Sequence, residues 1–394
     1  MSPLLVIFIT VFIDLLGFGI IIPLLPFYAE HFGATALTVG LLSTSFSLAQ
    51  FLFAPFWGRL SDGIGRRPVI LVGLLGSAAS YAFFALATSL PMLFLARTLA
   101  GIAGANIPTA QAFIADTTTP ETRAKGMGMI GAAFGLGFIF GPAIGGFLSH
   151  WGYAAPAWFA AGISLANFVA ALLLLPESRP AHARDSGGPG RVEVIRRALM
   201  RPHLPPVLLV YFLVVTAFAS FEATFALYSE RRFAFTPATI GYMFAWIGVV
   251  LTTVQGLLVG KVVKQIGEKT LVPLAIFVIA TALALVPLAG SVPLLAAATG
   301  LLALGMGFNS PSLLSAISQL ADPNDQGSTL GVSQSLGSLA RVIGPMWGGW
   351  VFDQLGIRYP FFTAAGLMLV ASILSMAAFS RVQLRPGAAH GSGV

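Results

Sequence analysis

The chain has 394 residues, of which 57% are hydrophobic and only 9% are charged. Soluble domains carry roughly 25% charged residues, so this composition excludes a soluble globular protein. The chain contains no cysteine, which excludes disulfides, thiol catalysis and cysteine-ligated metal sites.

Apolar runs of about 20 residues recur along the whole chain, and each is long enough to cross a bilayer. No basic segment or cleavage site accompanies the first run, so we interpret it as a retained helix rather than a signal peptide. The sequence predicts an all-α membrane protein with twelve transmembrane helices, at residues 4–26, 37–57, 69–88, 91–115, 126–148, 155–175, 205–228, 237–259, 271–289, 292–316, 327–350 and 359–379.

The basic residues are distributed unevenly over the connections between these spans. With the amino terminus inside, sixteen Lys and Arg residues fall in cytoplasmic segments, and only Arg231, Arg232 and Arg358 fall in outer loops. This bias predicts that both termini are cytoplasmic. The net charge of +7 therefore reflects membrane topology, with the lipid bilayer as the partner, and does not indicate nucleic-acid binding.

A polar stretch separates six spans from the next six. It contains the flexible sequence Asp185–Gly190, and the basic segment Arg191–Met200 can form a short amphipathic helix on the inner surface. The predicted domains are an N-terminal six-helix bundle at 1–176, a cytoplasmic linker at 177–204, a C-terminal six-helix bundle at 205–380 and a cytoplasmic tail at 381–394.

The two halves repeat one another. The charged loop Gly58–Pro68 returns 202 residues later in weakened form as Gly260–Lys269, and Gly141–Gly146 returns as Gly344–Gly349. Parallel repeats of this kind predict two pseudo-symmetric bundles, with the substrate bound between them near the middle of the membrane.

Four segments resemble motifs of one transporter family, the major facilitator superfamily. The loop at 58–68 matches its signature of Gly-x-Leu-x-Asp-x-x-Gly-Arg-Arg, Arg97–Gly101 is similar to its fourth-helix motif, and Gly137–Gly146 is similar to its antiporter motif. Asp14–Pro26 resembles the first helix of tetracycline-efflux pumps among the twelve-helix drug/proton antiporters. The resemblance implies the major facilitator fold and a functional monomer.

Ionisable side chains inside spans cost about 2.5–3.5 kcal/mol at the membrane centre, so each needs a reason. We hypothesise that Asp14 and Glu222 titrate during transport; the alternative is that they form fixed ion pairs. The resemblance implies that Arg97 influences proton release, with Asp14 as its predicted partner, whereas hydrogen bonds to helix-end carbonyls are the alternative. Arg341 either attracts anionic substrate groups or pairs with Glu222.

The loop motif supplies a predicted gate. The resemblance implies that Asp62 docks on a helix end of the other half and stabilises the outward-facing state, an interaction that the second copy loses because Lys264 replaces Asp62. Ordinary inside-positive charge is the alternative for the arginines, and a solvated helix cap is the alternative for Asp116. The predicted gating residues are Gly58, Asp62, Gly65, Arg66, Arg67, Asp116 and Arg123.

Two further sets concern packing and the substrate. Small residues permit close approach of two helices, and a proline kinks a span. The family resemblance implies in addition that this tight contact seals the transporter against leakage. The predicted packing residues are Gly137, Gly141, Pro142, Gly145 and Gly146. Polar or aromatic side chains within spans either line a substrate cavity or make interhelical and lipid contacts; the cavity candidates are Gln50, Asn106, Gln111, Phe221, Phe225, Trp246, Asn309 and Arg341.

These features predict a proton-coupled antiporter in a bacterial-type inner membrane that exports small amphiphilic compounds or drugs, antibiotics included. The alternative is a proton-coupled transporter of a specific metabolite or lipid. The expected partners are protons and a small-molecule substrate. The sequence has no phosphate-binding loop, no metal-ligand cluster and no paired nucleophile and base, so we expect neither a cofactor nor an enzymatic activity. A receptor without net transport has little need for intramembrane carboxylates.

Overall fold

The structure is a computed structural model that describes residues 2–104, 106–118, 120–178, 196, 200, 201, 203–321 and 326–380, without the side chains of 120–125, 127 and 326–328. The predicted tail and most of the predicted linker lie outside these residues. The described part is almost entirely helical and contains no strand. In it, ten stretches are long and apolar enough to cross a membrane. One of them, Pro237–Leu288, contains two predicted spans, and the predicted span 327–350 lies in a further helix.

Contacts between residues divide the chain into two compact units. Unit 1 consists of Met1–Gly187, Ala223–Gly248 and Pro345–Gln354, and unit 2 of Gly188–Glu222, Val249–Gly344 and Leu355–Val394. Three long helices contribute to both units: α10 (Leu204–Phe233), α11 (Pro237–Thr253) and α14 (Gln326–Leu355).

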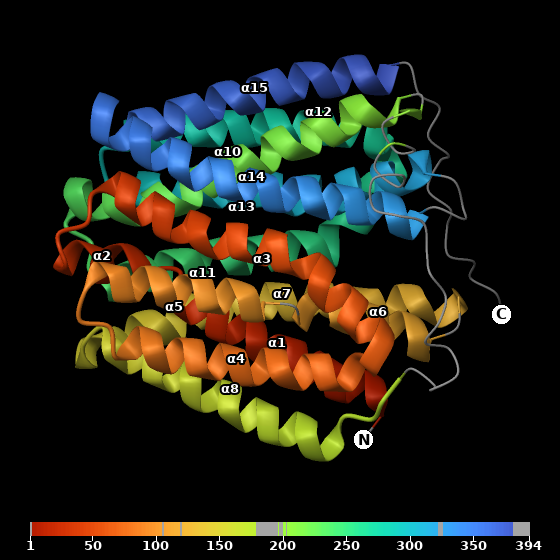
Figure 1. Ribbon diagram of the computed structural model, residues 1–394. Helices are drawn as coiled ribbons and strands as arrows, with labels where there is room; N and C mark the ends of the chain where they lie inside the picture. Colours follow the sequence, from red (N-terminus) through yellow and green to blue (C-terminus); the bar gives the residue numbers. More distant parts are fainter. Residues whose placement is uncertain are drawn as a thin grey trace. The chain divides into compact units, whose positions relative to one another are not determined.

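Unit 1 holds the helices of the first half of the sequence. In it α1 packs against α7 and α8, α4 packs against α5, α6 and α8, and α3 packs against α5 (Figure 1). Its elements are α1 (Pro3–Ile21), α2 (Leu25–His31), α3 (Ala36–Ile64), α4 (Arg66–Ala85), α5 (Leu90–Ala103), α6 (Asn106–Thr117), α7 (Pro120–Leu148), the 3-10 turn η1 (Ser149–Trp151) and α8 (Ala154–Leu174).

Unit 2 is organised around α12, which packs against both α13 and α15. A π-helical turn, η3, joins α11 to α12. The elements are η3 (Val254–Leu258), α12 (Val259–Leu285), the 3-10 turn η4 (Val286–Leu288), α13 (Val292–Leu320) and α15 (Tyr359–Ser380).

Each copy of the repeated charged loop turns at a glycine. Gly65, between α3 and α4, has φ 108° and ψ 164°, and Gly267, inside α12, has φ 70° and ψ 161°. Glycine reaches these positive φ values without the steric cost that a Cβ atom imposes. Gly267 therefore makes a kink within α12, in the connection between the eighth and ninth predicted spans.

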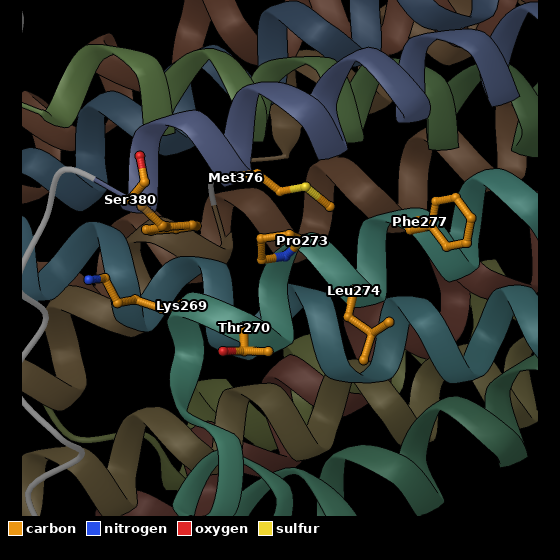
Figure 2. A pocket seen from close by; sticks show the side chains of 8 residues that line it. Lys269, Thr270, Pro273, Leu274, Phe277, Met376 and Ser380 are labelled. Carbon is orange, nitrogen blue, oxygen red and sulfur yellow. The ribbon is translucent and has the colours of Figure 1, made fainter.

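A groove lies on the surface of unit 2 between α12 and α15, with a volume of about 650 Å³. Figure 2 shows Lys269 and Ser380 at one end of it and Phe277 at the other. Leu274 and Met376 along its length are about half exposed. Exposed apolar side chains on a membrane-spanning helix match the hydrocarbon of the bilayer, so this groove faces the surroundings of the unit rather than its core.

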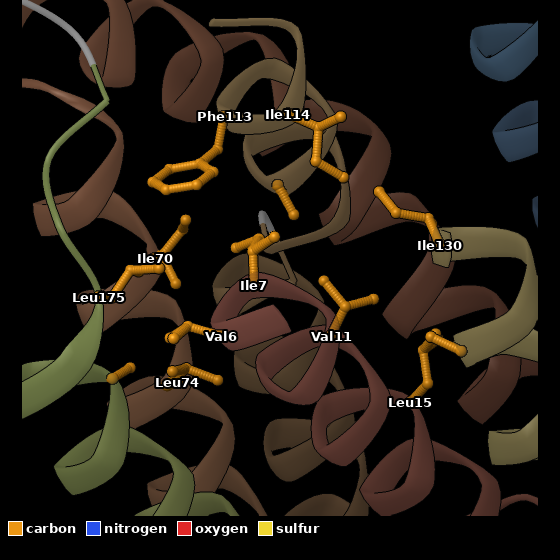
Figure 3. Close-up of a cluster of buried hydrophobic side chains, with 13 residues drawn as sticks. Val6, Ile7, Val11, Leu15, Ile70, Leu74, Phe113, Ile114, Ile130 and Leu175 are labelled. Carbon is orange, nitrogen blue, oxygen red and sulfur yellow. The ribbon is translucent and has the colours of Figure 1, made fainter. Parts of the chain in front are cut away.

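The core of unit 1 positions α1. Val6, Ile7, Val11 and Leu15 project from α1 among apolar side chains of α4, α6, α7 and α8 (Figure 3). The other members of this cluster are Ile70, Leu74, Ala110, Phe113, Ile114, Ile130, Ala133, Ala171 and Leu175. Asp14 precedes Leu15 in α1, so this packing fixes the height and rotation of the helix that carries the carboxyl group.

Candidate functional site

Asp14 is held by neutral side chains. Its Oδ1 accepts a hydrogen bond of 3.1 Å from Asn106 Nδ2, at the start of α6, and one of 3.4 Å from Ser77 Oγ, on α4. Asn106 and Ser77 are buried. These donors compensate part of the cost of a carboxylate inside a span without fixing its charge as an arginine would.

A helix break places Asn106 beside Asp14. The predicted span 91–115 is divided into α5 and α6, and Gly104 between them has ψ 35°. Side chains of α3 compensate the carbonyl groups near the break, because Gln50 Nε2 donates to Gly104 O at 3.1 Å and the Trp57 indole donates to Ile102 O. Of the cavity candidates, Gln50 and Asn106 thus have structural hydrogen bonds here.

A glycine of α4 makes room for the Asn106 amide. A Cβ atom at Gly73 would collide with Asn106 Oδ1. Gly73, Ser77 and Tyr81 recur at every fourth residue and therefore occupy one face of α4. Sequence reasoning missed Ser77 and Tyr81, although a polar side chain at that spacing in an apolar span is a readable signal.

Arg97 and Tyr81 lie close to the group formed by Asp14, Asn106 and Ser77. The buried Arg97 guanidinium on α5 stacks over the ring of Phe46 on α3, with 4.4 Å between Cζ and the ring centroid. Tyr81 packs against Gly17 of α1 and interacts electrostatically with both Asp14 and Arg97. Tyr81 thus lies within the electrostatic influence of both Asp14 and Arg97, while a direct pairing of Asp14 with Arg97 stays a prediction.

Glu222 and Arg341, its possible partner from the sequence, belong to unit 2. Glu222 lies within α10 and is half-buried, as is Arg341 on α14, which interacts electrostatically with Tyr211 of α10. Phe221 is fully buried and packs edge-on against Phe361 of α15.

The remaining cavity candidates have mixed surroundings. Asn309 is buried in α13, and its Oδ1 has no hydrogen-bond partner among the described residues. Phe225 is fully buried in unit 1 and packs edge-on against Phe244, Gln111 is half-buried, and Trp246 is 43% exposed. Burial therefore makes Phe221 and Phe225 core residues in this structure.

The loop motif forms a compact charge network. Buried Arg66 contacts Asp62 at 2.9 Å, Asp116 of α6 at 3.0 Å and Ser61 Oγ at 2.7 Å. Arg67 donates to Leu172 O at 2.6 Å. The structure thus brings Asp116 to the loop, whereas the side chain of Arg123 lies outside the described part.

Glu177 belongs to the same network, and sequence reasoning missed it. Its carboxylate accepts from the backbone N–H groups of Arg66 and Arg67 at 2.8 and 3.2 Å, which caps the start of α4. A Cβ atom at Gly65 would collide with this carboxylate. The sequence signal was an acidic residue directly after the sixth predicted span, which we assigned only to the linker at 177–204.

The second copy of the loop reverses the charge at its centre. Buried Glu268, the counterpart of Arg66, accepts from Ser315 Oγ and Gln319 Nε2 of α13, both at 3.1 Å. The two loops thus share their backbone turn but differ in chemistry. In the first, an arginine pairs with carboxylates, and in the second, a carboxylate accepts hydrogen bonds from neutral side chains.

The glycines of α7 face α1 at backbone distance. Cβ atoms added at Gly137, Gly141 and Gly145 would lie 2.5–3.0 Å from atoms of Leu15, Gly19 and Ile20. At Gly146 the closest atoms belong to α11, at Ala238 and Gly241, and Pro142 O lies against Gly241 as well. The last of the predicted gating glycines, Gly58, has open space around its Cβ position.

Comparisons with known proteins agree with this architecture. The family model described as Major Facilitator Superfamily matches residues 7–345 and 233–392. Multidrug resistance protein 2 of Bacillus subtilis is 33% identical over 373 residues, covering 93% of this chain and 92% of its own. Tetracycline resistance protein, class E, of Escherichia coli is 35% identical over 360 residues, with 87% and 89% covered.

A solved structure supports the same assignment. The human organic anion transporter MFSD10 superposes with a TM-score of 0.73 at 30% identity, covering 94% of this chain and 98% of its own. The family match, the near-full-length relatives and the helical architecture together show that the chain belongs to the major facilitator superfamily of membrane transporters.

Proposed function

We propose that this transporter is a proton-coupled antiporter that exports small amphiphilic compounds or drugs by alternating access. The observation that carries the proposal is the neutral environment of Asp14, an intramembrane carboxyl group bonded to Asn106 and Ser77. A hydroxyl group donates to a carboxylate and can turn to accept from a carboxylic acid, so Ser77 suits both forms of Asp14. A site that accommodates both forms can cycle a proton.

The relatives support this substrate class. Proteins named for multidrug and tetracycline resistance are 31–35% identical to the chain over most of its length. We assign Arg97, with Tyr81, to the control of proton release at Asp14, and Glu222 to a second protonatable position. The assignment of Asp62 as a latch for the outward-facing state belongs to the same proposal.

The proposal also covers the oligomeric state, membrane location and topology of the transporter. We place it as a monomer in a bacterial-type inner membrane, with both termini cytoplasmic and with six-helix bundles at 1–176 and 205–380. The positive-inside bias supports this orientation. A tag at either terminus should be cleaved by protease in everted but not in right-side-out vesicles, and the reverse pattern would overturn the orientation.

Asp14→Asn tests the proton site. Asparagine keeps the size of aspartate but cannot titrate, so export driven by a pH gradient in everted vesicles should fall to the level of empty vesicles. Asp14→Glu restores an acid at the same position and should recover part of the activity. Undiminished pH-driven export by a well-inserted Asp14→Asn protein would refute the assignment.

A second candidate function is the proton-coupled transport of a specific metabolite or lipid. The specific observation in its favour is the likeness to a human protein described as an organic anion transporter. Counterflow with labelled cationic, neutral and anionic compounds separates the two functions. Broad exchange of amphiphilic cations supports drug export, whereas exchange confined to one class of anion or lipid supports the alternative.

A further inference from the structure

Two glutamates occupy equivalent positions at the end of unit 1 that lies opposite the 58–68 loop along α3. Glu30 lies near the end of α2 and Glu230 in the last turn of α10; the alignment of Tyr28 with Tyr228 makes them counterparts in the repeat. Their carboxyl groups lie within hydrogen-bonding reach of each other, and one oxygen of Glu230 is buried with no hydrogen-bond partner among the described residues.

One arginine is shared by the pair. Arg231 Nη2 lies 3.2 Å from Glu30 Oε1 and interacts electrostatically with Glu230, while its guanidinium stacks over Phe352 at 4.8 Å. Two carboxylates and one guanidinium leave one uncompensated negative charge. A hydrogen bond between two carboxyl groups needs a proton on one of them, and that proton makes the cluster neutral.

The other charged groups on the surrounding elements have their own contacts. His31 of α2 packs against Phe32 and Tyr153, and Arg232 of α10 lies over the ring of Phe233. Asp353 of α14 accepts from the backbone N–H groups of α3 at Ala36 and Leu37, at 3.2 and 2.8 Å. The glutamate pair and Arg231 therefore form the group whose charge balance depends on a single proton.

The pair lies where segments distant in sequence close tightly on one another. Gly349 of α14 meets the backbone of Ala36, and Gly146 of α7 meets Ala238 of α11, with no room for a Cβ atom at either glycine without displacing its neighbour. Such a contact is either made or broken, because packed backbones do not separate gradually. A change of charge at its edge can thus bias a two-state element.

We propose that Glu30 and Glu230 form a second proton-binding site, which holds this end of unit 1 closed when it carries a proton and favours opening when the proton leaves. Opening separates two like charges that the closed arrangement forces together. The inference rests on the proposed alternating access, and it adds a proton site remote from Asp14, at the predicted outer end.

The absence of cysteine allows a direct test, because a single introduced cysteine is the sole thiol. Ala238→Cys places it at a buried position in the closed contact, and Gly290→Cys places it at an exposed site as a reference. Labelling by a maleimide is measured in lipid nanodiscs, and the ratio of the two rates removes the intrinsic pH dependence of thiol reactivity. Ala36→Cys, buried on α3, serves as a second reporter.

The ratio should rise about fivefold or more between about pH 5 and about pH 8. Glu230→Gln and Glu30→Gln should each keep it low and flat, while His31→Gln should leave the rise intact. A flat ratio in the otherwise unchanged chain, an unchanged rise in both glutamine variants, or a rise lost in His31→Gln would overturn the proposal.

Asp14→Asn separates this inference from the proposed function. That variant should lose pH-driven export and keep the pH-dependent labelling. A labelling response lost in Asp14→Asn would assign the effect to the first site and overturn the second. A pH-dependent labelling response in the otherwise unchanged chain, together with no pH-driven export of any amphiphilic compound by that same chain, would leave the glutamate pair standing without the drug-export proposal.

Discussion

Asp14 depends on residues that carry no charge. The hydrogen-bonding groups of Asn106 and Ser77 reach it because α4 presents Gly73, Ser77 and Tyr81 on one face and because α6 begins at Asn106. An intramembrane acid surrounded in this way has a defined geometry without a fixed ion pair, which is the property a proton carrier needs.

Gly73→Ala should therefore reduce proton-coupled transport although it adds only a methyl group. The new Cβ would displace the Asn106 amide from Asp14, and hydrogen bonds to charged groups contribute about 1.5–3 kcal/mol. Efflux driven by a pH gradient, normalised to the amount of inserted protein, is the measurement. Gly162→Ala on α8, where a Cβ meets open space, is the matched control and should behave as the unchanged chain. Equal activity of both variants would contradict the role of Asn106.

For single residues, the sequence identified the charged side chains inside the spans and missed several of their partners. Asp14 and Arg97 are conspicuous because charge is expensive inside an apolar run. Tyr81, Ser77 and Glu177 are ordinary residues in isolation, and their contacts with Asp14, Arg97 and α4 arise only when separate helices are packed together.

Helix α7 approaches α1 through glycines, and this predicts an asymmetric response along one helix. A Cβ at Gly141 would lie 2.7 Å from the Cα of Gly19, whereas a Cβ at Gly131 meets nothing within 4 Å. Overpacking costs about 1–3 kcal/mol, while alanine in an open helical position gains up to about 1 kcal/mol over glycine. Gly141→Ala should lower the unfolding temperature in detergent and Gly131→Ala should hold or raise it; the opposite order would show that the α1–α7 contact is loose.

The start of α4 offers a second prediction for an element. Glu177→Ala removes the carboxylate that caps Arg66 and Arg67, and the loss of a helix cap costs about 1 kcal/mol. The unfolding temperature should fall, whereas Glu177→Gln keeps an acceptor oxygen and should fall less. Identical values for both variants would mean that the cap contributes through charge alone.

The ends of helices were predictable from the sequence where an apolar run ends in charged residues. They were not predictable where local backbone geometry ends the helix. The sequence placed the fourth span as one run, but the structure divides it at Gly104, where α3 side chains bond to the adjacent carbonyls. Arg231 and Arg232, predicted in an outer loop, lie in the last turn of α10, where cationic side chains interact favourably with the helix dipole.

Across the whole chain, the sequence repeat predicted the architecture. The two copies of the charged loop nevertheless carry opposite charges at their buried central residue. Gly65 and Gly267 turn the two copies of the loop alike, yet the buried residue that follows is Arg66 in one copy and Glu268 in the other. Sequence comparison revealed the exchange of residues. It could not reveal that α6 supplies Asp116 to the first while α13 supplies Ser315 and Gln319 to the second.

The two copies should therefore respond differently to loss of their central charge. Arg66→Gln leaves Asp62 and Asp116 without their cation. It should destabilise the protein by more than about 1 kcal/mol, because Arg66 is buried and Asp116 is largely shielded from solvent, although Asp62 is exposed. Glu268→Gln keeps an acceptor for Ser315, removes a buried charge, and offers an amide to Gln319 Oε1, which lacks a hydrogen-bond partner in the described part of the chain. Thermal unfolding in detergent should show a lower temperature for the first variant and an unchanged or higher one for the second. Equal losses would mean that Glu268 is stabilised by its charge, and that the second loop is held together in the same way as the first.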